Sequence, residues 1–160
     1  MWAKALGADK IVGISRSNEK KEDALKMGAT DFIATNDDKD WAKHHARSLD
    51  LIVSTVSSPK MPLMEYLQLL RTKGTFIQVG APEDKLPDFN AFAFIAKGVK
   101  FGGSMIGPPH EIEEMLKLAV EKKVHPWIQK YPMKDANKAV MDMDAGKARY
   151  RISLVNEKHL

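Results

Sequence analysis

The amino-acid sequence predicts an α/β fold in which helices cover both faces of a doubly wound parallel sheet. Strand-like and helix-like segments alternate over about the first three quarters of the chain, which is typical of parallel sheets. In the strand-like segments apolar residues run through both faces, as in LDLIVSTV at residues 49–56. Such runs indicate strands that are covered on both faces. The chain has 160 residues, of which 44% are hydrophobic, and this is enough for one sizeable core.

The first half of the chain supplies four of the expected strands, at residues 10–15, 31–35, 49–56 and 75–79. Between them we expect a helix over 18–27, a polar loop with a short helical turn over 36–48, and a helix over 59–70. Gly28 and Gly74 mark helix ends and Pro59 marks a helix start. Gly is common just after a helix and Pro in its first turn.

The second half continues the pattern with a loop at 80–87, a short helix at 91–96 and a strand at 99–106. Pro108 and Pro109 begin a further helix, and we expect its apolar residues to be buried: Ile112, Met115, Leu116 and residues 118–120. A strand at 127–131, a helix at 134–143 and a strand at 148–155 then form a strand–helix–strand tail.

The composition argues against several classes of function. No apolar run approaches the roughly 20 residues of a membrane helix, and the N-terminus does not resemble a signal peptide. The 25 Lys and Arg residues are interspersed with 21 Asp and Glu, so the sequence does not favour nucleic-acid binding. The chain has no Cys, which fits a reducing compartment. We therefore expect a cytoplasmic protein with neither a membrane nor a nucleic-acid partner.

Patterns for metal binding and hydrolysis are missing. The five His residues form no HExxH motif, and no Ser lies in G-x-S-x-G, so neither a metal site nor a hydrolase is predicted. The Gly-rich residues 102–107 lack the endings and spacings of phosphate loops. The acidic helix start after them would also repel an anion. We expect these glycines to allow close approach to a neighbouring strand, a subunit or a nicotinamide ring.

Candidate binding residues lie after the strands, because ligands of open α/β sheets bind beyond the carboxyl ends. The first strand ends in Ser15 and Arg16, and Lys20 follows. A hydroxyl, a guanidinium and an ammonium suit a phosphomonoester, here the 2′-phosphate of NADP. An NAD site usually has Asp or Glu at this point for the ribose hydroxyls. An ordinary polar loop with helix-capping residues is the alternative interpretation.

Two further strand ends are weaker candidates. Thr55 and Val56, followed by Ser57 and Ser58, come after the most apolar strand, and Val79 and Gly80 come after the next. Gly80 would let the backbone approach a flat ring closely. A plain strand-to-loop transition explains either pair equally well. Arg149 and Arg151 would place cations near a pyrophosphate, or belong to an ordinary surface strand.

Several motifs, in this order, resemble the medium-chain zinc alcohol dehydrogenases, and among them the NADP-dependent cinnamyl-alcohol dehydrogenases. They are LGA at residues 6–8, SRS at 15–17, KMGA at 26–29, DLIV at 50–53, GSMIG at 103–107 and GKARYR at 146–151. The resemblance implies a Rossmann-type sheet. It also implies cofactor contacts by Ser15, Arg16 and Lys20 (2′-phosphate), Thr55, Val56, Val79 and Gly80 (nicotinamide), Ser104, Met105 and Ile106 (carboxamide), and Arg149 or Arg151 (pyrophosphate).

By this resemblance the function is hydride transfer between NADP(H) and a small alcohol or aldehyde, with a catalytic zinc polarising the oxygen. In the family, the zinc ligands lie in an N-terminal domain that this sequence does not contain. We expect an incomplete dinucleotide-binding domain at residues 1–124 and a segment at 125–160 that returns toward the catalytic domain. The chain by itself is expected to be inactive. A homodimer is expected through the sheet edge around residues 99–106.

The resemblance also implies that the first Rossmann strand and its Gly-rich turn are missing, and that residues 1–6 are the end of the following helix. The usual strand order places that strand between those at 10–15 and 49–56. Without it, each buried unpaired backbone group would cost about 1–3 kcal/mol. We therefore expect direct re-pairing of the two strands, strand exchange between molecules, or a longer polypeptide.

Two functions of other classes remain as alternatives. One is a non-catalytic nucleotide-binding or dimerisation module that uses the same sheet edge. The other is an S-adenosylmethionine-dependent methyltransferase, which shares the doubly wound sheet. Ser15 and Arg16 argue against the methyltransferase, because an acidic ribose contact would be expected at that strand end.

Overall fold

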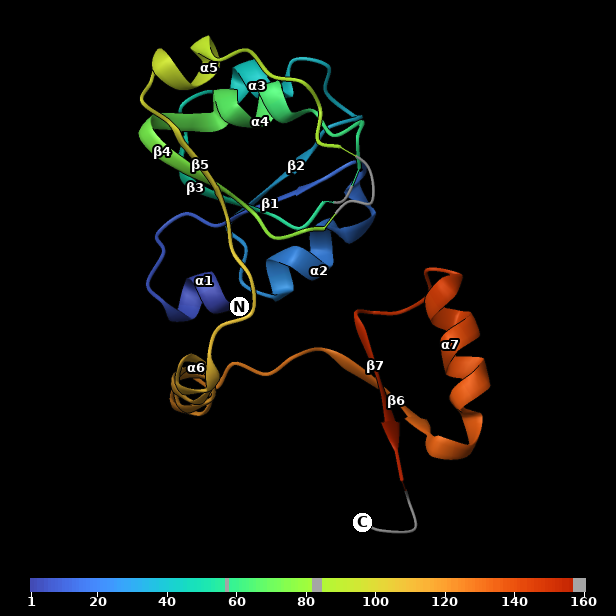
Figure 1. Ribbon diagram of the computed structural model, residues 1–160. Coiled ribbons are helices and arrows are strands. Elements are labelled where there is room, and N and C mark those ends of the chain that lie inside the picture. The colour runs from blue at the N-terminus through green and yellow to red at the C-terminus, as the bar shows by residue number, and fades with distance from the viewer. Residues whose placement is uncertain (57, 82–84, 157–160) are drawn as a thin grey trace.

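The computed structural model describes residues 1–56, 58–81 and 85–156 (Figure 1). All the strands pair in parallel, and the last two form a strand–helix–strand tail, so the predicted fold class is confirmed. In the described part of the chain the strands divide into three sheets. These are β1 (Val12–Ser15) with β2 (Asp31–Ala34), then β3 (Leu49–Ser54), β4 (Leu70–Gln78) and β5 (Lys100–Gly103), and finally β6 (Ile128–Pro132) with β7 (Arg151–Val155).

The helices lie on both sides of the first two sheets. Figure 1 shows α3, α4 and α5 on one side and α1 and α2 on the other. None of the helices in the described ranges is long and apolar enough to cross a membrane. The helix bounds are α1 Trp2–Ala5, α2 Lys21–Lys26 after a 3-10 turn at Asn18–Lys20, α3 Trp41–His44, α4 Leu63–Leu69, α5 Phe92–Ile95, α6 Pro109–Glu121, and α7 Ala136–Asp144 after a 3-10 turn at Met133–Asp135.

The core lies between the β3–β4–β5 sheet and helices α3 and α4. Phe76 of β4 is fully buried and stacks on Phe101 of β5, with ring centroids 5.1 Å apart. The other fully buried large side chains are Leu63, Leu67, Leu69 and Leu70. Burying a side chain of this size contributes about 1.5–3 kcal/mol relative to leaving it exposed. This apolar layer packs the β3–β4–β5 sheet against helices α3 and α4.

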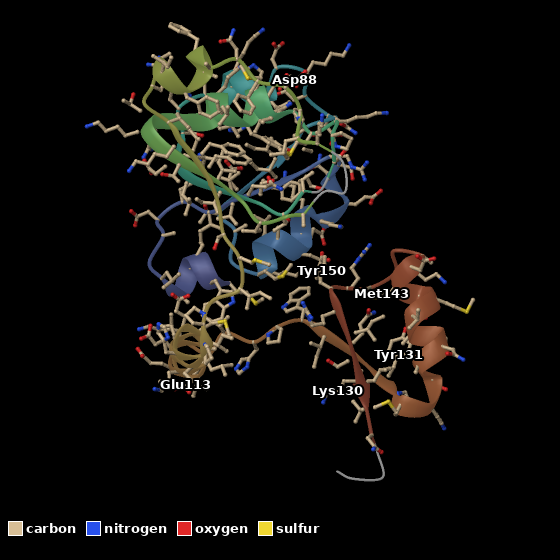
Figure 2. All side chains as sticks on the ribbon, viewed as in Figure 1. Asp88, Glu113, Lys130, Tyr131, Met143 and Tyr150 are labelled. Atoms are coloured by element: carbon tan, nitrogen blue, oxygen red, sulfur yellow. The ribbon has the colours of Figure 1, made fainter. Side chains whose placement is uncertain are left out.

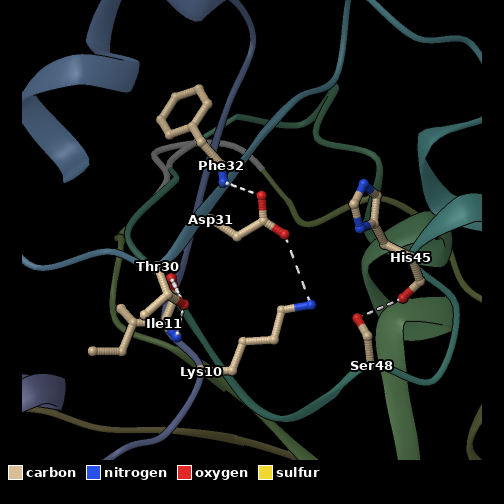
Figure 3. A network of polar contacts seen from close by, with 7 residues as sticks. All are labelled: Lys10, Ile11, Thr30, Asp31, Phe32, His45 and Ser48. Atoms are coloured by element: carbon tan, nitrogen blue, oxygen red, sulfur yellow. Dashed lines mark hydrogen bonds and ion pairs between the residues drawn. The ribbon is translucent and has the colours of Figure 1, made fainter.

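The β1–β2 sheet is anchored at its N-terminal end by polar contacts (Figure 3). The backbone N–H of Ile11 donates to Thr30 Oγ1 at 2.9 Å, and that hydroxyl donates to the Ile11 carbonyl at 3.1 Å. Lys10 and Asp31 form an ion pair at 3.8 Å. These contacts sit next to the pair Val12↔Asp31 and hold the register of the two strands.

A cleft of about 650 Å³ separates β1 from β3. Its walls include Val12 and Ile14 on one side and Leu51 and Val53 on the other. The two strands belong to different sheets, so the expected direct re-pairing is wrong. Each strand is held by its own partner, β1 by β2 and β3 by β4. Strand exchange and a longer polypeptide stay predictions.

The expectation that the strand at 49–56 is covered on both faces is also wrong. Ile52 and Ser54 are buried, but Leu51 and Val53 are each 56% exposed. Alternate side chains of a strand point to opposite faces. One face packs on the core, whereas the other borders the cleft.

Helix α6 differs from the expectation in its burial. Ile112 and Met115 are about two fifths exposed, Leu116 is 55% exposed and Val120 is 79% exposed. Only Leu118 and Ala119 are half-buried. Figure 1 shows α6 end-on, below α1 in this view and apart from the strands. The periodic pattern correctly predicted a helix with these apolar residues. It could not show whether another part of the chain packs against them.

Some element boundaries differ from the sequence prediction. Helix α4 begins at Leu63 rather than near Pro59, because Pro62 disfavours helical backbone at the residue before it. Strand β4 begins at Leu70, so Gly74 lies inside a strand and does not end the helix. Strand β5 ends at Gly103. Residues 82–84 of the expected loop lie outside the described residues.

Candidate functional site

The residues after β1 form an exposed, cationic strand end. Ser15 is the last residue of β1, and Arg16 and Lys20 are exposed. The backbone N–H of Thr35 donates to the Ser15 carbonyl at 2.9 Å, and that of Asn36 to the Arg16 carbonyl at 3.0 Å. These bonds extend the ladder beyond the regular strands. The backbone around Arg16 is therefore held by the two residues that follow β2, while its side chain is exposed to solvent.

Lys20 lies beside a residue from the far end of the sequence. Its ammonium is 6.0 Å from the centroid of the Tyr150 ring, and the guanidinium of Arg149 is also 6.0 Å from that centroid. The Tyr150 hydroxyl donates to Asp23 Oδ2 at 2.7 Å. Figure 2 shows Tyr150 close below α2. The structure thus brings Arg149 and Lys20, which lie far apart in the sequence, to the same aromatic ring.

The environment of Tyr150 keeps its hydroxyl protonated. Burial and the hydrogen bond to the Asp23 carboxylate raise the pKa of Tyr150 above its usual value near 10. A phenol must keep its proton to donate to a carboxylate. The bond between Tyr150 and Asp23 is therefore available throughout the neutral pH range.

The ends of β3 and β4 are tied together by Gln78. Its side-chain amide donates to the carbonyls of Val56 at 2.8 Å and Gly80 at 2.7 Å. A Cβ on Gly80 would lie 2.6 Å from the Val56 carbonyl oxygen and 2.7 Å from that of Thr55. Only glycine fits there, because of the protein's own backbone. Thr55, Val56, Val79 and Gly80 thus form one rim, and Ser57 lies outside the described residues.

The segment after β5 reaches the same edge. The backbone N–H of Ser104 donates to the Gln78 carbonyl at 3.3 Å. Met105 and Ile106 follow, and they are 92% and 86% exposed. A Cβ at Gly102 or Gly103 would meet no atom closer than 3.6 Å. Close approach to β4 therefore does not explain these glycines.

The two arginines of the tail have different positions. Arg149 precedes β7 and is tied to the tail, because its backbone N–H donates to Gln129 Oε1 at 2.9 Å. Arg151 begins β7 and is exposed, with Ile128 as its ladder partner. Within the described ranges, only Arg149 is joined through a ring contact to the residues at the end of β1.

Sequence reasoning missed four residues of this region: Ser54, Gln78, Asp23 and Tyr150. Ser54 Oγ and Gln78 Oε1 are buried and have no hydrogen-bond partner among the described atoms. They lie on paired positions at the ends of β3 and β4. Buried polar atoms without a hydrogen-bond partner are expected at a sheet edge where a polar ligand binds. Gln78 is the one polar residue in the apolar run FIQV, which is a signal that could have identified it.

The described part of the chain contains no group of three or more His, Cys, Asp or Glu residues that could hold a metal ion. His44 is explained by its contact with Asp38, 2.7 Å away. A backbone N–H from Asp40 and the contact with His44 lower the pKa of Asp38. The Asp38 carboxylate therefore stabilises the local turn through these contacts.

Comparison with known proteins agrees with the fold. A family model described as zinc-binding dehydrogenase matches residues 1–121. The NADP-dependent alcohol dehydrogenase C 1 of Mycolicibacterium smegmatis is 39% identical over 149 residues, which are 93% of this chain and 42% of that protein. Cinnamyl alcohol dehydrogenase 2 of Rauvolfia serpentina is 34% identical over 151 residues, which are 94% of this chain and 41% of that protein.

Solved structures show the same fold. The cinnamyl alcohol dehydrogenase of Sorghum bicolor matches with a TM-score of 0.82 and 31% identity over 91% of this chain and 40% of its own. The enzyme of this type from Helicobacter pylori, complexed with NADP(H), matches with a TM-score of 0.78 and 33% identity over 96% of this chain and 42% of its own. This chain therefore spans about two fifths of the length of these relatives and belongs to the zinc-binding dehydrogenase family.

Proposed function

We propose that this chain binds NADP(H) as the cofactor-binding part of an oxidoreductase that interconverts alcohols and aldehydes. The observation that carries the proposal is the end of β1, where Ser15 is followed by the exposed cations Arg16 and Lys20. Arg and Lys suit a phosphomonoester, whereas an NAD site usually offers a carboxylate to the ribose hydroxyls. The names of the relatives, such as the NADP-dependent alcohol dehydrogenase of Mycolicibacterium smegmatis, support it.

The other strand ends would receive the nicotinamide half of the cofactor, which supplies the hydride when it is bound. The rim of Thr55, Val56, Val79 and Gly80 is held by the two hydrogen bonds from Gln78. A rim held in this way positions a ring without rearrangement. Ser104, Met105 and Ile106 would offer backbone groups to the carboxamide. Arg149 or Arg151 would bind the pyrophosphate.

Substrate and partners belong to the same proposal. The substrate would be a small alcohol or aldehyde. A zinc ion that polarises its oxygen would be held by residues other than those described here. Isolated from such residues, this chain would be inactive. A cytoplasmic location is proposed because the chain has no Cys.

A homodimer would form through the outer edge of β5. This strand is at the end of its sheet, so one of its edges has no strand beside it in the described part of the chain. Met105 and Ile106, which are almost fully exposed, extend the edge. The same observation favours the second candidate function, a non-catalytic nucleotide-binding or dimerisation module. Light scattering together with an aldehyde-reduction assay on a protein that contains this chain would separate the two functions.

Titration of the chain with NADPH and NADH, followed by fluorescence, tests the proposal. We expect NADPH to bind more tightly, and Arg16→Ala to weaken NADPH about tenfold to a hundredfold, because a hydrogen bond to a charged group contributes about 1.5–3 kcal/mol. NADH affinity should not change. Lys26→Ala is the matched control, since Lys26 is an exposed cation of α2, the helix that follows Arg16 in the chain, and pairs with Glu22. Tighter binding of NADH than of NADPH would contradict the assignment of Arg16.

A further inference from the structure

Tyr150 connects the C-terminal segment, defined as residues 127–155, to the rest of the molecule. Its hydroxyl donates to Asp23 Oδ2 at 2.7 Å. Among described residues up to 155, this is the one side-chain hydrogen bond between the C-terminal segment and the preceding chain. Figure 2 shows the labelled Tyr150 just below α2.

Asp23 and Lys20 are three residues apart, so they lie on neighbouring positions of one helical face. Tyr150 contacts both of them. Its hydroxyl engages the Asp23 carboxylate, and its ring lies under the Lys20 ammonium at 6.0 Å. No ion pair joins Lys20 to a carboxylate in the described ranges. Tyr150 therefore engages the acid one helical turn from Lys20, and Lys20 keeps its charge free of an ion pair within the described ranges.

The same ring faces a second cation. The Arg149 guanidinium lies 6.0 Å from its centroid, so cations from two distant parts of the sequence share one aromatic ring. Cations are attracted to such a ring, but they repel each other. An anion with two negative charges would relieve this repulsion. A phosphomonoester is an anion of this kind.

We propose that Tyr150 is a positioning residue for the 2′-phosphate of NADP, and that Arg149 is a specificity residue for the same phosphate. Tyr150 keeps Lys20 and Arg149 beside one aromatic ring, so the phosphate meets one cation from the 3-10 turn after β1 and one from the C-terminal segment. Arg149 then serves the 2′-phosphate and not the pyrophosphate. This inference rests on the proposed function, because it requires the 2′-phosphate to bind beside Arg16.

The test compares two small nucleotides that differ by this phosphate. Adenosine 2′,5′-bisphosphate and 5′-AMP are titrated into the full chain, and amide chemical shifts in NMR spectra report even millimolar dissociation constants. We expect Tyr150→Leu and Arg149→Gln each to weaken the bisphosphate about two- to fivefold, which is the scale of a cation–π contact at an exposed site. Tyr150→Phe keeps the ring and should lose less than Tyr150→Leu. The affinity for 5′-AMP should stay the same in all three variants.

Tyr131 provides a matched control inside the C-terminal segment. Its hydroxyl donates to Asp142 at 3.1 Å, and its ring lies 5.1 Å from the Lys138 ammonium. It thus repeats the contacts of Tyr150 without touching α2. Tyr131→Phe should leave the affinities for both nucleotides unchanged. The dispersion of the amide signals shows whether each variant is folded.

The outcomes separate this inference from the proposed function. If Lys20→Gln weakens the bisphosphate but Tyr150→Leu and Arg149→Gln do not, the positioning role is wrong and the proposed function stands. If Tyr150→Leu weakens both nucleotides equally, its role is structural and the inference also fails. If 5′-AMP binds as tightly as the bisphosphate, or if neither binds, the 2′-phosphate site is wrong and the inference fails with it.

Discussion

Position 80 requires glycine because the backbone of the neighbouring strand end lies too close for a side chain. A Cβ at this position would lie 2.6 Å from the Val56 carbonyl oxygen and 2.7 Å from that of Thr55. These atoms are backbone, so they cannot rotate away as a side chain would. The strand-end rule predicted that Gly80 belongs to the site. It could not reveal that the constraint comes from Thr55 and Val56, since that contact depends on how β3 and β4 are paired.

We therefore expect Gly80→Ala to lower the free energy of unfolding by about 1–3 kcal/mol, the range for inserting an extra methyl group into packed surroundings. Denaturant unfolding followed by circular dichroism measures this change. Gly103→Ala is the matched control, because a Cβ there would come no closer than 3.6 Å to another atom. Equal losses for the two variants would show that the rim at Thr55 and Val56 can move aside.

The contacts of Tyr150 could not be predicted from the sequence, unlike the residues at the end of β1. Ser15, Arg16 and Lys20 could be proposed from the sequence, since they lie at the end of a strand or within a few residues after it. Asp23 and Tyr150 are 127 residues apart, and no local pattern connects them. Their hydrogen bond follows from the path of the chain after α6, which short-range periodicity does not determine.

At the scale of elements, Lys97 holds the end of α4. Its ammonium donates to the carbonyls of Leu67 at 2.6 Å and Leu70 at 2.8 Å. The last carbonyls of a helix have no partner within the helix, so this side chain replaces the missing bonds. Burial lowers the pKa of Lys97, with the charge of Arg47 as the second cause. The side chain connects the loop before β5 to the start of β4.

Removing this contact should destabilise the protein. Lys97→Met keeps a long apolar stem but leaves the buried carbonyls unsatisfied, and we expect a loss of about 1–3 kcal/mol in the free energy of unfolding. Lys100→Met is the control, because Lys100 is an exposed lysine at the start of β5. Thermal and denaturant unfolding of both variants measure the difference. A loss no greater than that of the control would mean that water replaces the ammonium.

The C-terminal segment depends on one acidic residue. Asp142 of α7 accepts hydrogen bonds from Lys138, Lys147 and Tyr131. Lys138 is the largest cause that lowers its pKa, from 3.8 to about 2. The pKa is lower in the folded state, so the carboxylate stabilises the segment fully above its unfolded pKa. This stabilisation is lost as the pH falls through the folded pKa.

We therefore expect the order of the C-terminal segment to decrease as the pH falls from about 4 to about 2. NMR signals of α7 and of the β6–β7 sheet measure this loss. Asp142→Asn should remove the pH dependence in this window and weaken the segment already at neutral pH. Asp144→Asn is the control, because no ion pair of Asp144 is found within the described ranges. An unchanged profile in Asp142→Asn would mean that other carboxylates govern the transition.

For the molecule as a whole, the alternation of elements was sufficient to predict the parallel strands and the order of the helices. The division into separate sheets required coordinates. The same is true of α6, whose apolar residues were recognised and whose exposure was not. Periodicity states which residues share a face, but burial depends on a partner surface that comes from elsewhere in the chain. Leu51 and Val53 differ from expectation for the same reason.

The cleft between β1 and β3 leads to a prediction about the backbone. The carbonyls of Ile11 and Ser15 accept bonds from the β2 side, and that of Ser54 accepts bonds from the β4 side. Backbone groups of successive residues in a strand point to opposite edges. The amides of Val12, Ile14, Leu51 and Val53 therefore face the cleft. We expect them to exchange their hydrogens with solvent much faster than those of Gly13 and Ile52.

Hydrogen exchange measured at several protein concentrations then shows whether the backbone amides at the cleft edges of β1 and β3 bind solvent or a strand of another molecule. Unpaired parallel edges are templates for another strand. If molecules exchange strands, the four cleft amides should become protected as the concentration rises, while Gly13 and Ile52 change little. Concentration-independent exposure would exclude strand exchange between copies of this chain. Protection at all concentrations would contradict the separation of β1 from β3, because the amides would then need a partner within one molecule.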